Sequence, residues 1–431
     1  MHFRRICSVL FAFLQAVIFP AVPVLILVLP FSISAPAQTY TVLHTFTGRK
    51  DGAYPFAGLT IDKDNNLYGT ANAGGNINAS CPPVNAGCGL VYELKPSRVG
   101  WNFHPLYVFH GGKDGEGPYG RVVLGPGGKG LYGTTVEGGD EQPCPSGCGL
   151  VFRLTQPSKC KTKTCTWKES ILYRFHGNID GLYPSGDLTF DTAGNIYGTT
   201  MQGGSFGPGT IYELTSAKPD WNENILWNFT GNNDGGNPSS GVTFDPAGHL
   251  YATAFQGGDQ QSGGAVVELS YSQSAWNVNT FYDFSGSSGV FPVAGLLLDN
   301  AGNLIGACAS GGPGKNGGTV YQLMPPGGDV SVLYNFSGGD ESGPWAKLTM
   351  DAAGDLYGTT QGDPSTGNWG TVFKLTRSKN GPWTETIVHK FTGGMDGGYP
   401  LTNLVFDSKG NLYGTTNLGG TGYGVVFEIT P

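Results

Sequence analysis

The sequence predicts an all-β fold, a seven-bladed β-propeller whose blades are four-stranded antiparallel sheets. Three observations support this prediction. A pattern close to DxxGNLYGTT recurs at intervals of 52 to 65 residues, each interval holds four strand signals, and one strand without a repeat of its own opens the repeat region. Such intervals suit a propeller blade better than the roughly 20–45-residue unit of a solenoid. The central position of the pattern holds Tyr68, Tyr132, Tyr197, Tyr251, Ile305, Tyr357 and Tyr413.

The unit between residues 188 and 229 shows how each interval forms four strands. Residues 188–190 alternate and lead into the turn Asp-Thr-Ala-Gly-Asn, where glycine and asparagine accept the positive φ of a tight hairpin. Residues 196–200, 210–214 and 221–229 are rich in β-branched and aromatic side chains, as strands are. The third strand begins near Leu90, Leu150, Thr210, Ala265, Thr319, Thr371 and Val425 in the seven units.

The two ends of the repeat region are incomplete in complementary ways. Six fourth strands end in a shared aromatic motif, LYVFHG, LYRFHG, LWNFTG, FYDFSG, LYNFSG and VHKFTG, whereas the chain stops at Pro431 directly after the seventh third strand. The missing motif is LHTFTG, in the strand of residues 39–47. An open ring would expose unpaired strand edges. We therefore predict that residues 39–47 close the last blade, with His44 and His389 in packing positions of their strands.

Composition and the N-terminus indicate an exported chain. The 431 residues carry a net charge of −8 without a cluster of Lys or Arg, which argues against nucleic acid as a partner. Two arginines precede an apolar run that ends near Phe31, and a small-x-small site follows at Ala37. We interpret residues 1–37 as a signal peptide, with an uncleaved membrane anchor as the alternative. Residues 38–431 are then one domain, expected to be a monomer, without a membrane span, in the cell envelope or secreted.

Seven cysteines follow the leader, and six of them form close sequence pairs. In an exported chain such pairs are typical of local disulfides. Metal ligation is the competing interpretation, but no cysteine has a histidine nearby at finger-like spacing. We predict the disulfides Cys81–Cys88, Cys144–Cys148 and Cys160–Cys165, which leave Cys308 over.

The repeat resembles a known family. Its markers GNLYGTT, a following GG loop and GxVFxL are similar to those of the secreted bacterial proteins with GloVer-type tandem repeats, over nearly all of residues 39–431. The DxxGNLY hairpin also resembles, more weakly, that of NHL and gluconolactonase-like propellers. The resemblance implies an exported β-propeller of largely undefined activity, and it implies no catalytic residues.

Two sets of polar residues are candidates for a site among the loops between blades. The first is an aspartate four residues before the loop proline, which would cap its own turn or join a ring that binds calcium: Asp51, Asp114, Asp180, Asp234, Asp340 and Asp396. The second is the third residue after that proline, where the repeat varies: Gly58, Arg121, Asp187, Gly241, Gly295, Lys347 and Asn403. Because the first strand lies innermost, Arg121, Asp187, Lys347 and Asn403 are expected at the channel mouth, paired with one another or facing a ligand.

Aromatic residues gather around the same loops and suit stacking on sugar rings or contact with a protein. The candidates are Tyr54, Tyr119, Tyr183, Trp345, Trp369 and Tyr399. We therefore predict a binding or scaffold propeller that recognises a glycan or a protein. A hydrolase or lyase using the four polar channel residues, with or without calcium, is one alternative, and a structural envelope protein is another. No cofactor is assigned, because no catalytic or metal motif is present in the sequence.

Overall fold

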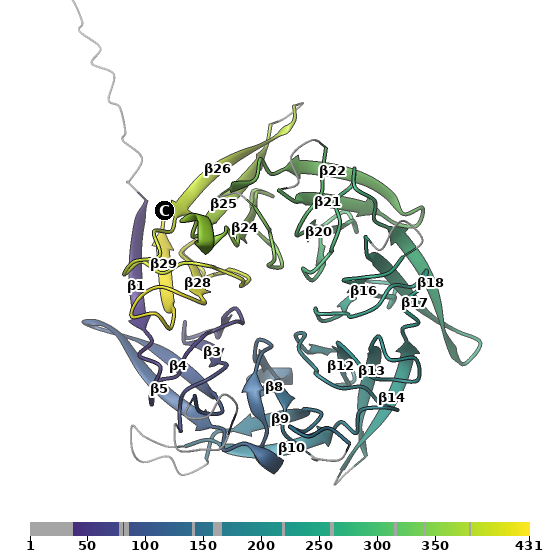
Figure 1. The fold of residues 1–431 in the computed structure, drawn as a ribbon, viewed down its shortest axis with the longest axis horizontal. Coiled ribbons are helices and arrows are strands. Elements are labelled where there is room, and N and C mark those ends of the chain that lie inside the picture. Colours follow the sequence, from purple (N-terminus) through teal and green to yellow (C-terminus); the bar gives the residue numbers. More distant parts are fainter. Residues whose placement is uncertain are drawn as a thin grey trace, which may run out of the picture. The chain divides into compact units, whose positions relative to one another are not determined.

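The computed structural model describes residues 38–76, 81, 86–139, 143–157, 166–217, 220–258, 263–313, 317–339, 342–378 and 381–431. The chain divides into two units, Met1–Ala37 and Gln38–Pro431, and the expected leader lies outside the described residues. Within Gln38–Pro431, seven antiparallel sheets form a ring (Figure 1), which confirms the predicted seven-bladed propeller. None of the described helices is long and apolar enough to span a membrane.

We number the blades 1 to 7 along the chain and their strands a to d from the centre outward. Blade 1 holds β2 (Thr60–Ile61), β3 (Leu67–Ala71), β4 (Leu90–Ser97) and β5 (Gly100–Val108). Blade 2 holds β6 (Glu116–Pro118), β7 (Val123–Leu124), β8 (Leu131–Glu137), β9 (Leu150–Thr155) and β10 (Lys168–Arg174), and both β6 and β7 pair with β8. Blade 3 holds β11 (Thr189–Phe190), β12 (Ile196–Thr200), β13 (Thr210–Ala217) and β14 (Asp220–Asn228). Blade 4 holds β15 (Thr243–Phe244), β16 (Leu250–Ala254), β17 (Ala265–Ser272) and β18 (Ala275–Asp283).

The remaining blades repeat this order. Blade 5 holds β19 (Leu297–Leu298), β20 (Leu304–Cys308), β21 (Thr319–Met324) and β22 (Asp329–Asn335). Blade 6 holds β23 (Thr349–Met350), β24 (Leu356–Thr360), β25 (Thr371–Arg377) and β26 (Trp383–Lys390). Blade 7 holds β27 (Val405–Phe406), β28 (Leu412–Thr416), β29 (Val425–Thr430) and, as its outer strand, β1 (Thr39–Thr45). The described part of the chain also has three short 3₁₀ helices, η1 (Gly112–Asp114), η2 (Pro126–Gly128) and η4 (Pro364–Thr366).

The N-terminal strand closes the ring, as the sequence predicts. β1 pairs antiparallel with β29, from Thr39 opposite Thr430 to Thr45 opposite Val425. Directly after β1, Phe46 is fully buried in a hydrophobic cluster with residues of blades 7 and 1. The closure therefore consists of strand pairing and apolar packing, without a covalent link between the two ends.

The two histidines expected in packing positions lie on either side of this closure. Tyr40 of β1 stacks on His389 of β26, with ring centroids 3.8 Å apart. His44 of β1 stacks on Phe103 of β5, with centroids 4.0 Å apart. Burial lowers the pKa of both histidines, although Asp51 and Asp396 beside them act in the opposite direction. Both rings thus contribute to packing between blades.

The outer strand of every blade contains a β-bulge at the same repeat position. In β14 the extra residue is Leu226, and in β1 it is Leu43. A bulge bends a strand and increases its local twist. This feature was not predicted from the sequence. The shared bulge makes β1 structurally equivalent to the six covalently connected outer strands.

Adjacent blades are joined by apolar side chains and by threonine hydrogen bonds. Each outer strand is followed by a phenylalanine that is at most 2% exposed: Phe46, Phe109, Phe175, Phe229, Phe284, Phe336 and Phe391. Near the centre, the Thr189 hydroxyl donates to the carbonyl oxygen of Val242 at 2.8 Å, and that of Thr243 donates to Leu296 at 2.7 Å. These bonds tie one inner strand to the next and fix the spacing of the chain segments around the central axis.

Three tyrosines of strand c bury hydroxyl groups that have no hydrogen-bond partner among the described residues: Tyr92, Tyr212 and Tyr321. The same repeat position holds phenylalanine in three other blades, for example Phe373. Because an unsatisfied buried hydroxyl is costly, Tyr212→Phe is expected to raise the free energy of unfolding by about 1 kcal/mol in urea denaturation. The reverse change, Phe373→Tyr, is expected to lower it. A drop in stability for Tyr212→Phe would contradict the assignment of that hydroxyl as unsatisfied.

Two of the three predicted disulfides are present. They join Cys81 to Cys88 and Cys144 to Cys148, and the Cα atoms are 5.3 Å apart in each. Cys160 and Cys165 lie outside the described residues. Cys308 is a buried free thiol, and burial raises its pKa, so the unreactive thiol form is favoured.

Candidate functional site

A cavity of about 420 Å³ lies at the centre of the ring, where the inner strands begin. Every blade lines it with the three consecutive residues that follow its loop proline, which gives three rings of seven residues. The rim ring is Phe56, Tyr119, Ser185, Ser239, Val293, Trp345 and Leu401. The middle ring is Ala57, Gly120, Gly186, Ser240, Ala294, Ala346 and Thr402. The inner ring is Gly58, Arg121, Asp187, Gly241, Gly295, Lys347 and Asn403, the variable positions that the sequence analysis selected.

An unusual backbone conformation brings these residues to the cavity. The residue before each loop proline has a positive φ: Tyr54 (55°), Gly117 (63°), Tyr183 (59°), Asn237 (53°), Phe291 (62°), Gly343 (69°) and Tyr399 (58°). For a bulky side chain this conformation is strained and persists only where surrounding bonds hold it. The Tyr399 N–H donates to the Trp369 carbonyl at 2.8 Å, and its carbonyl accepts from Asn417 at 3.2 Å. The strained peptide is thus fixed by the loops on both sides.

The rim is asymmetric. Its bulky residues come from blades 6, 7, 1 and 2, which are consecutive around the ring, whereas blades 3 to 5 contribute two serines and a valine. Phe56 stacks on Tyr119 with centroids 4.9 Å apart, and Tyr119 and Trp345 are 38% and 37% exposed. Ser185 is buried, and its hydroxyl has no partner among the described residues. The rim therefore has an aromatic side facing a side of small, polar residues.

Asp187 and Arg121 form an ion pair in the inner ring. The two carboxylate oxygens of Asp187 accept from the Arg121 backbone N–H and from its Nε, each at 3.0 Å. Both side chains are about one quarter exposed, so solvent partly screens the attraction between the two charges. Asp187 thus holds Arg121 in place from the neighbouring blade, with the terminal nitrogens of the guanidinium left for other partners.

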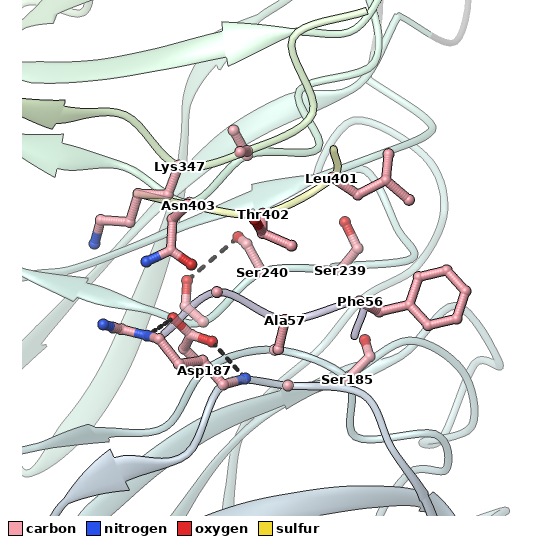
Figure 2. A pocket seen from close by; sticks show the side chains of 18 of the residues that line it. Phe56, Ala57, Ser185, Asp187, Ser239, Ser240, Lys347, Leu401, Thr402 and Asn403 are labelled. Atoms are coloured by element: carbon pink, nitrogen blue, oxygen red, sulfur yellow. Dashed lines mark hydrogen bonds and ion pairs between the residues drawn. The ribbon is translucent and has the colours of Figure 1, made fainter. Parts of the chain in front are cut away.

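Lys347 and Asn403 occupy the inner ring on blades 6 and 7. Figure 2 shows their side chains and that of Asp187 extending into the same part of the cavity. Gly295 leaves room for the Lys347 stem, because a Cβ there would lie 3.3 Å from Lys347 Cδ. Burial lowers the pKa of Lys347; the Asp187 carboxylate counteracts this, and Arg121 adds to it. Among the described residues, the Lys347 ammonium has no hydrogen-bond acceptor. The Asn403 side-chain amide likewise has no hydrogen-bond partner among them.

The structure separates the six aromatic candidates into two groups. Tyr119, Trp345 and Tyr399 line the cavity. Tyr54, Tyr183 and Trp369 do not belong to the lining. Trp369 lies against Gly393 and Gly398 of the next loop so closely that a Cβ at either glycine would overlap the indole. This tryptophan therefore packs within the scaffold.

Several lining residues were not among the candidates predicted from the sequence. Gln361, from the loop after β24, donates to the Tyr399 hydroxyl and belongs to the lining. Ser185, Ser239 and Leu401 also belong to it. A signal for the last three was available, because they occupy the repeat position of Tyr119 and Trp345.

The loop aspartates lie outside the cavity lining, and their carboxylates are engaged in their own turns. Each accepts from the backbone N–H four residues before it, at 2.8–3.0 Å: Asp51, Asp114, Asp180, Asp234 and Asp396. Four of them also bond to a histidine, tyrosine or tryptophan seven residues before them: Asp114, Asp180, Asp234 and Asp396. The Asp51 carboxylate lies 3.3 Å from His44 Nε2. This is the bonding that the capping interpretation predicts. Asp340 lies outside the described residues.

Solved structures with a similar fold include three bacterial proteins of low sequence identity. The GH74 enzyme of Niastella koreensis is 15% identical, with a TM-score of 0.52 over 90% of this chain and 53% of that one. The extracellular domain of a one-component system from B. thetaiotaomicron is 11% identical, with a TM-score of 0.50 over 90% and 39%. PorZ, a surface component of the type-IX secretion system of Porphyromonas gingivalis, is 13% identical, with a TM-score of 0.50 over 86% and 46%. The chain thus spans about half or less of these three proteins, and the likeness shows the fold alone.

No curated protein matches the chain. The Gloeobacter/Verrucomicrobia repeat matches residues 29–222 and residues 184–427, two overlapping segments that together cover nearly all of the propeller. This match agrees with the repeat markers in strands b and c. The chain therefore belongs to the Gloeobacter/Verrucomicrobia repeat family.

Proposed function

We propose that the protein is a carbohydrate-binding propeller whose ligand enters the central cavity from the loop face. The observation that carries this proposal is the asymmetric rim, in which exposed Tyr119 and Trp345 face a side of serines and small residues. Aromatic rings offer flat apolar surfaces to sugar rings, while hydroxyl and amide groups bind the sugar hydroxyls. Both kinds of group line the same cavity.

The size of the cavity supports a small ligand over a folded protein partner. A volume of about 420 Å³ lies within the roughly 300–1,000 Å³ of typical small-molecule pockets. A protein partner would contact the loop tips instead, where Ile179, Phe206 and Met395 are exposed. Ile179 lies in the loop between blades 2 and 3, Phe206 in a loop of blade 3 and Met395 in the loop between blades 6 and 7, and none of them lines the cavity.

The small number of carboxylates in the cavity lining favours a binding role over glycoside hydrolysis. Glycoside hydrolysis generally uses two carboxyl groups that flank the scissile bond. Among the described residues that line the cavity, Asp187 is the one carboxylate, and Arg121 engages both of its oxygens. The lining therefore supplies cations and amides for binding more readily than an acid and base pair.

We further propose that the propeller acts outside the cytoplasm, in the cell envelope or secreted. The two disulfides support this, since such bonds persist in oxidising compartments. The apolar leader with its small-x-small site at Ala37 supports it as well.

Binding can be tested by screening the purified protein against an oligosaccharide array and measuring the affinity of the best ligand by titration calorimetry. Trp345→Ala is expected to weaken binding about tenfold, because it removes a stacking surface from the rim. Phe206→Ala is the matched control, since Phe206 is an exposed aromatic residue of the loop face outside the lining. Unchanged affinity in Trp345→Ala, or an equal loss in both variants, would contradict the proposed site.

A further inference from the structure

The inner ring has an excess of cationic hydrogen-bond donors. Two cations, Arg121 and Lys347, and one carboxylate, Asp187, are the charged residues of the described lining. The carboxylate accepts from Arg121 with both oxygens, and the Lys347 ammonium has no acceptor among the described residues. A partly buried ammonium without an acceptor has lost hydration that nothing in the described structure replaces. The inner ring therefore has one cation more than it has carboxylates, and Lys347 is the cation without a bonded anionic partner.

The donors approach this space from different sides of the cavity. Arg121 stands on blade 2 and Lys347 on blade 6, and Arg121 is near enough to disfavour the charged form of Lys347. The Asn403 amide lies beside Lys347 on the neighbouring blade (Figure 2). Gly58 makes room for this amide, because a Cβ at Gly58 would overlap Asn403 Oδ1. With the oxygen against Gly58, the amide nitrogen is the part that remains for a ligand.

Residues without bulky side chains line the wall on blades 4 and 5, where the Lys347 stem lies against Gly295. The inner ring has glycine on blades 4 and 5, at Gly241 and Gly295, and the middle ring there has Ser240 and Ala294. A sugar ring can lie over these residues below the aromatic rim. Its substituent would then reach Lys347, Asn403 and the terminal nitrogens of Arg121.

We infer that the ligand is an acidic glycan, whose anionic group binds among Lys347, Asn403 and Arg121 in the inner ring. This inference rests on the proposed function, because it names the chemical class of the sugar bound at the same cavity. The shared chemistry is a sugar-borne anion, which a carboxylate or a sulfate can supply. The protein as a whole carries a net charge of −8, so attraction of anions is a local property of this ring.

The test compares pairs of ligands that share a sugar backbone and differ in whether its substituents carry a negative charge. Trigalacturonate and its methyl ester are titrated calorimetrically against the protein, with a sulfated and an unsulfated galactose trisaccharide as the second pair. We expect the charged member of one pair to bind at least about tenfold more tightly, since hydrogen bonds to charged groups are the stronger ones. Preference for trigalacturonate would assign the anion as a carboxylate, and preference for the sulfated trisaccharide would assign it as a sulfate.

Substitutions at Lys347 test whether the inner ring causes the preference for the charged ligand. Lys347→Met is expected to abolish it, and Lys347→Arg, which keeps the charge, is expected to retain it. Lys63→Met removes the same charge from an exposed hairpin, where the Lys63 side chain is 87% exposed, and is expected to leave the preference unchanged. Circular dichroism confirms that each variant is folded. A preference that survives in Lys347→Met would overturn the inference.

The outcomes separate the inference from the proposed function. Equal affinity for the charged and neutral members of both pairs would overturn the acidic-glycan inference and leave carbohydrate binding intact. If no trisaccharide binds, the proposed function fails, and thermal unfolding in sodium sulfate decides on the anion site. Stabilisation by sulfate that Lys347→Met loses would support an anion site without a glycan, whereas equal stabilisation of both proteins would overturn it.

Discussion

Deletion of Thr39–Thr47 is expected to abolish cooperative folding of the propeller. The deletion removes the outer strand of blade 7 together with Phe46, which is fully buried between blades 7 and 1. Each large apolar side chain lost contributes roughly 1.5–3 kcal/mol, against a total stability of about 5–15 kcal/mol for a typical domain. β29 would also become an unpaired edge that favours aggregation. Thermal unfolding followed by circular dichroism, together with size-exclusion chromatography, measures the effect.

A circular permutant provides the control for this deletion. In blade 7, Thr39 lies opposite Thr430, so a short turn can connect Pro431 to Gln38 and make β1 continuous with β29. The new termini would lie in the turn at Gly48–Gly52, which connects β1 to blade 1. The corresponding loops between all other neighbouring blades would stay continuous. This permutant is expected to fold and to unfold at a midpoint no lower than that of the parent. A deleted chain with the parent's midpoint, or a permutant that does not fold, would contradict closure by β1.

Gly241→Ala is expected to lower the free energy of unfolding by roughly 1–3 kcal/mol, the cost of overpacking a tight interior. A Cβ at Gly241 would lie 2.1 Å from the carbonyl oxygen of Asp187. This atom belongs to the backbone of blade 3, so the clash can be relieved only by moving one blade against the next. The same movement would shift Asp187 and disturb its pair with Arg121. Urea denaturation measures the stability, and ligand titration measures the effect on the site.

Gly295→Ala is the matched control, because Gly295 holds the same repeat position one blade further on. The nearest atom to a Cβ there is Cδ of Lys347, at 3.3 Å, which belongs to a flexible side chain. The lysine stem can move aside, so the variant is expected to keep nearly the parental stability. Equal destabilisation by the two alanines would show that the glycines are required for their backbone conformation and not for close approach between blades.

The fold could be predicted from the sequence because the repeat carries its local determinants. The hairpin turn, the strand c signal and the aromatic end of strand d recur in each unit, so counting them gave the seven blades and the closing strand. The bulge at Leu43 and Leu226 was not predicted, since the outer strands end in consecutive apolar residues, among which the shift in alternation is not visible in the sequence. The positive φ of Tyr183 was also unforeseen, because bulky residues rarely adopt it and neighbouring loops impose it here.

The candidate site could be predicted in part. The inner ring, with Arg121, Asp187 and Lys347, stood out as a variable position in an otherwise regular repeat, and the structure brings all seven of its members to one cavity. The grouping of the bulky rim residues on one side was not predicted, because the motif of a single unit says nothing about its neighbours around the ring. The packing of Trp369 on Gly393 and Gly398 was not predicted either, since an aromatic residue in a loop has the same sequence signature whether it packs on glycines or faces a ligand.

The bulge shared by all seven outer strands has a consequence for how such a protein can grow. Because the extra residue fixes which neighbours face each other, the register of an outer strand is encoded within the strand itself. A duplicated unit would therefore carry the register of its own outer strand. The neighbouring blades would need no compensating change in sequence. Tandem duplication followed by divergence at the channel positions could therefore produce new binding surfaces while every copy kept the same scaffold.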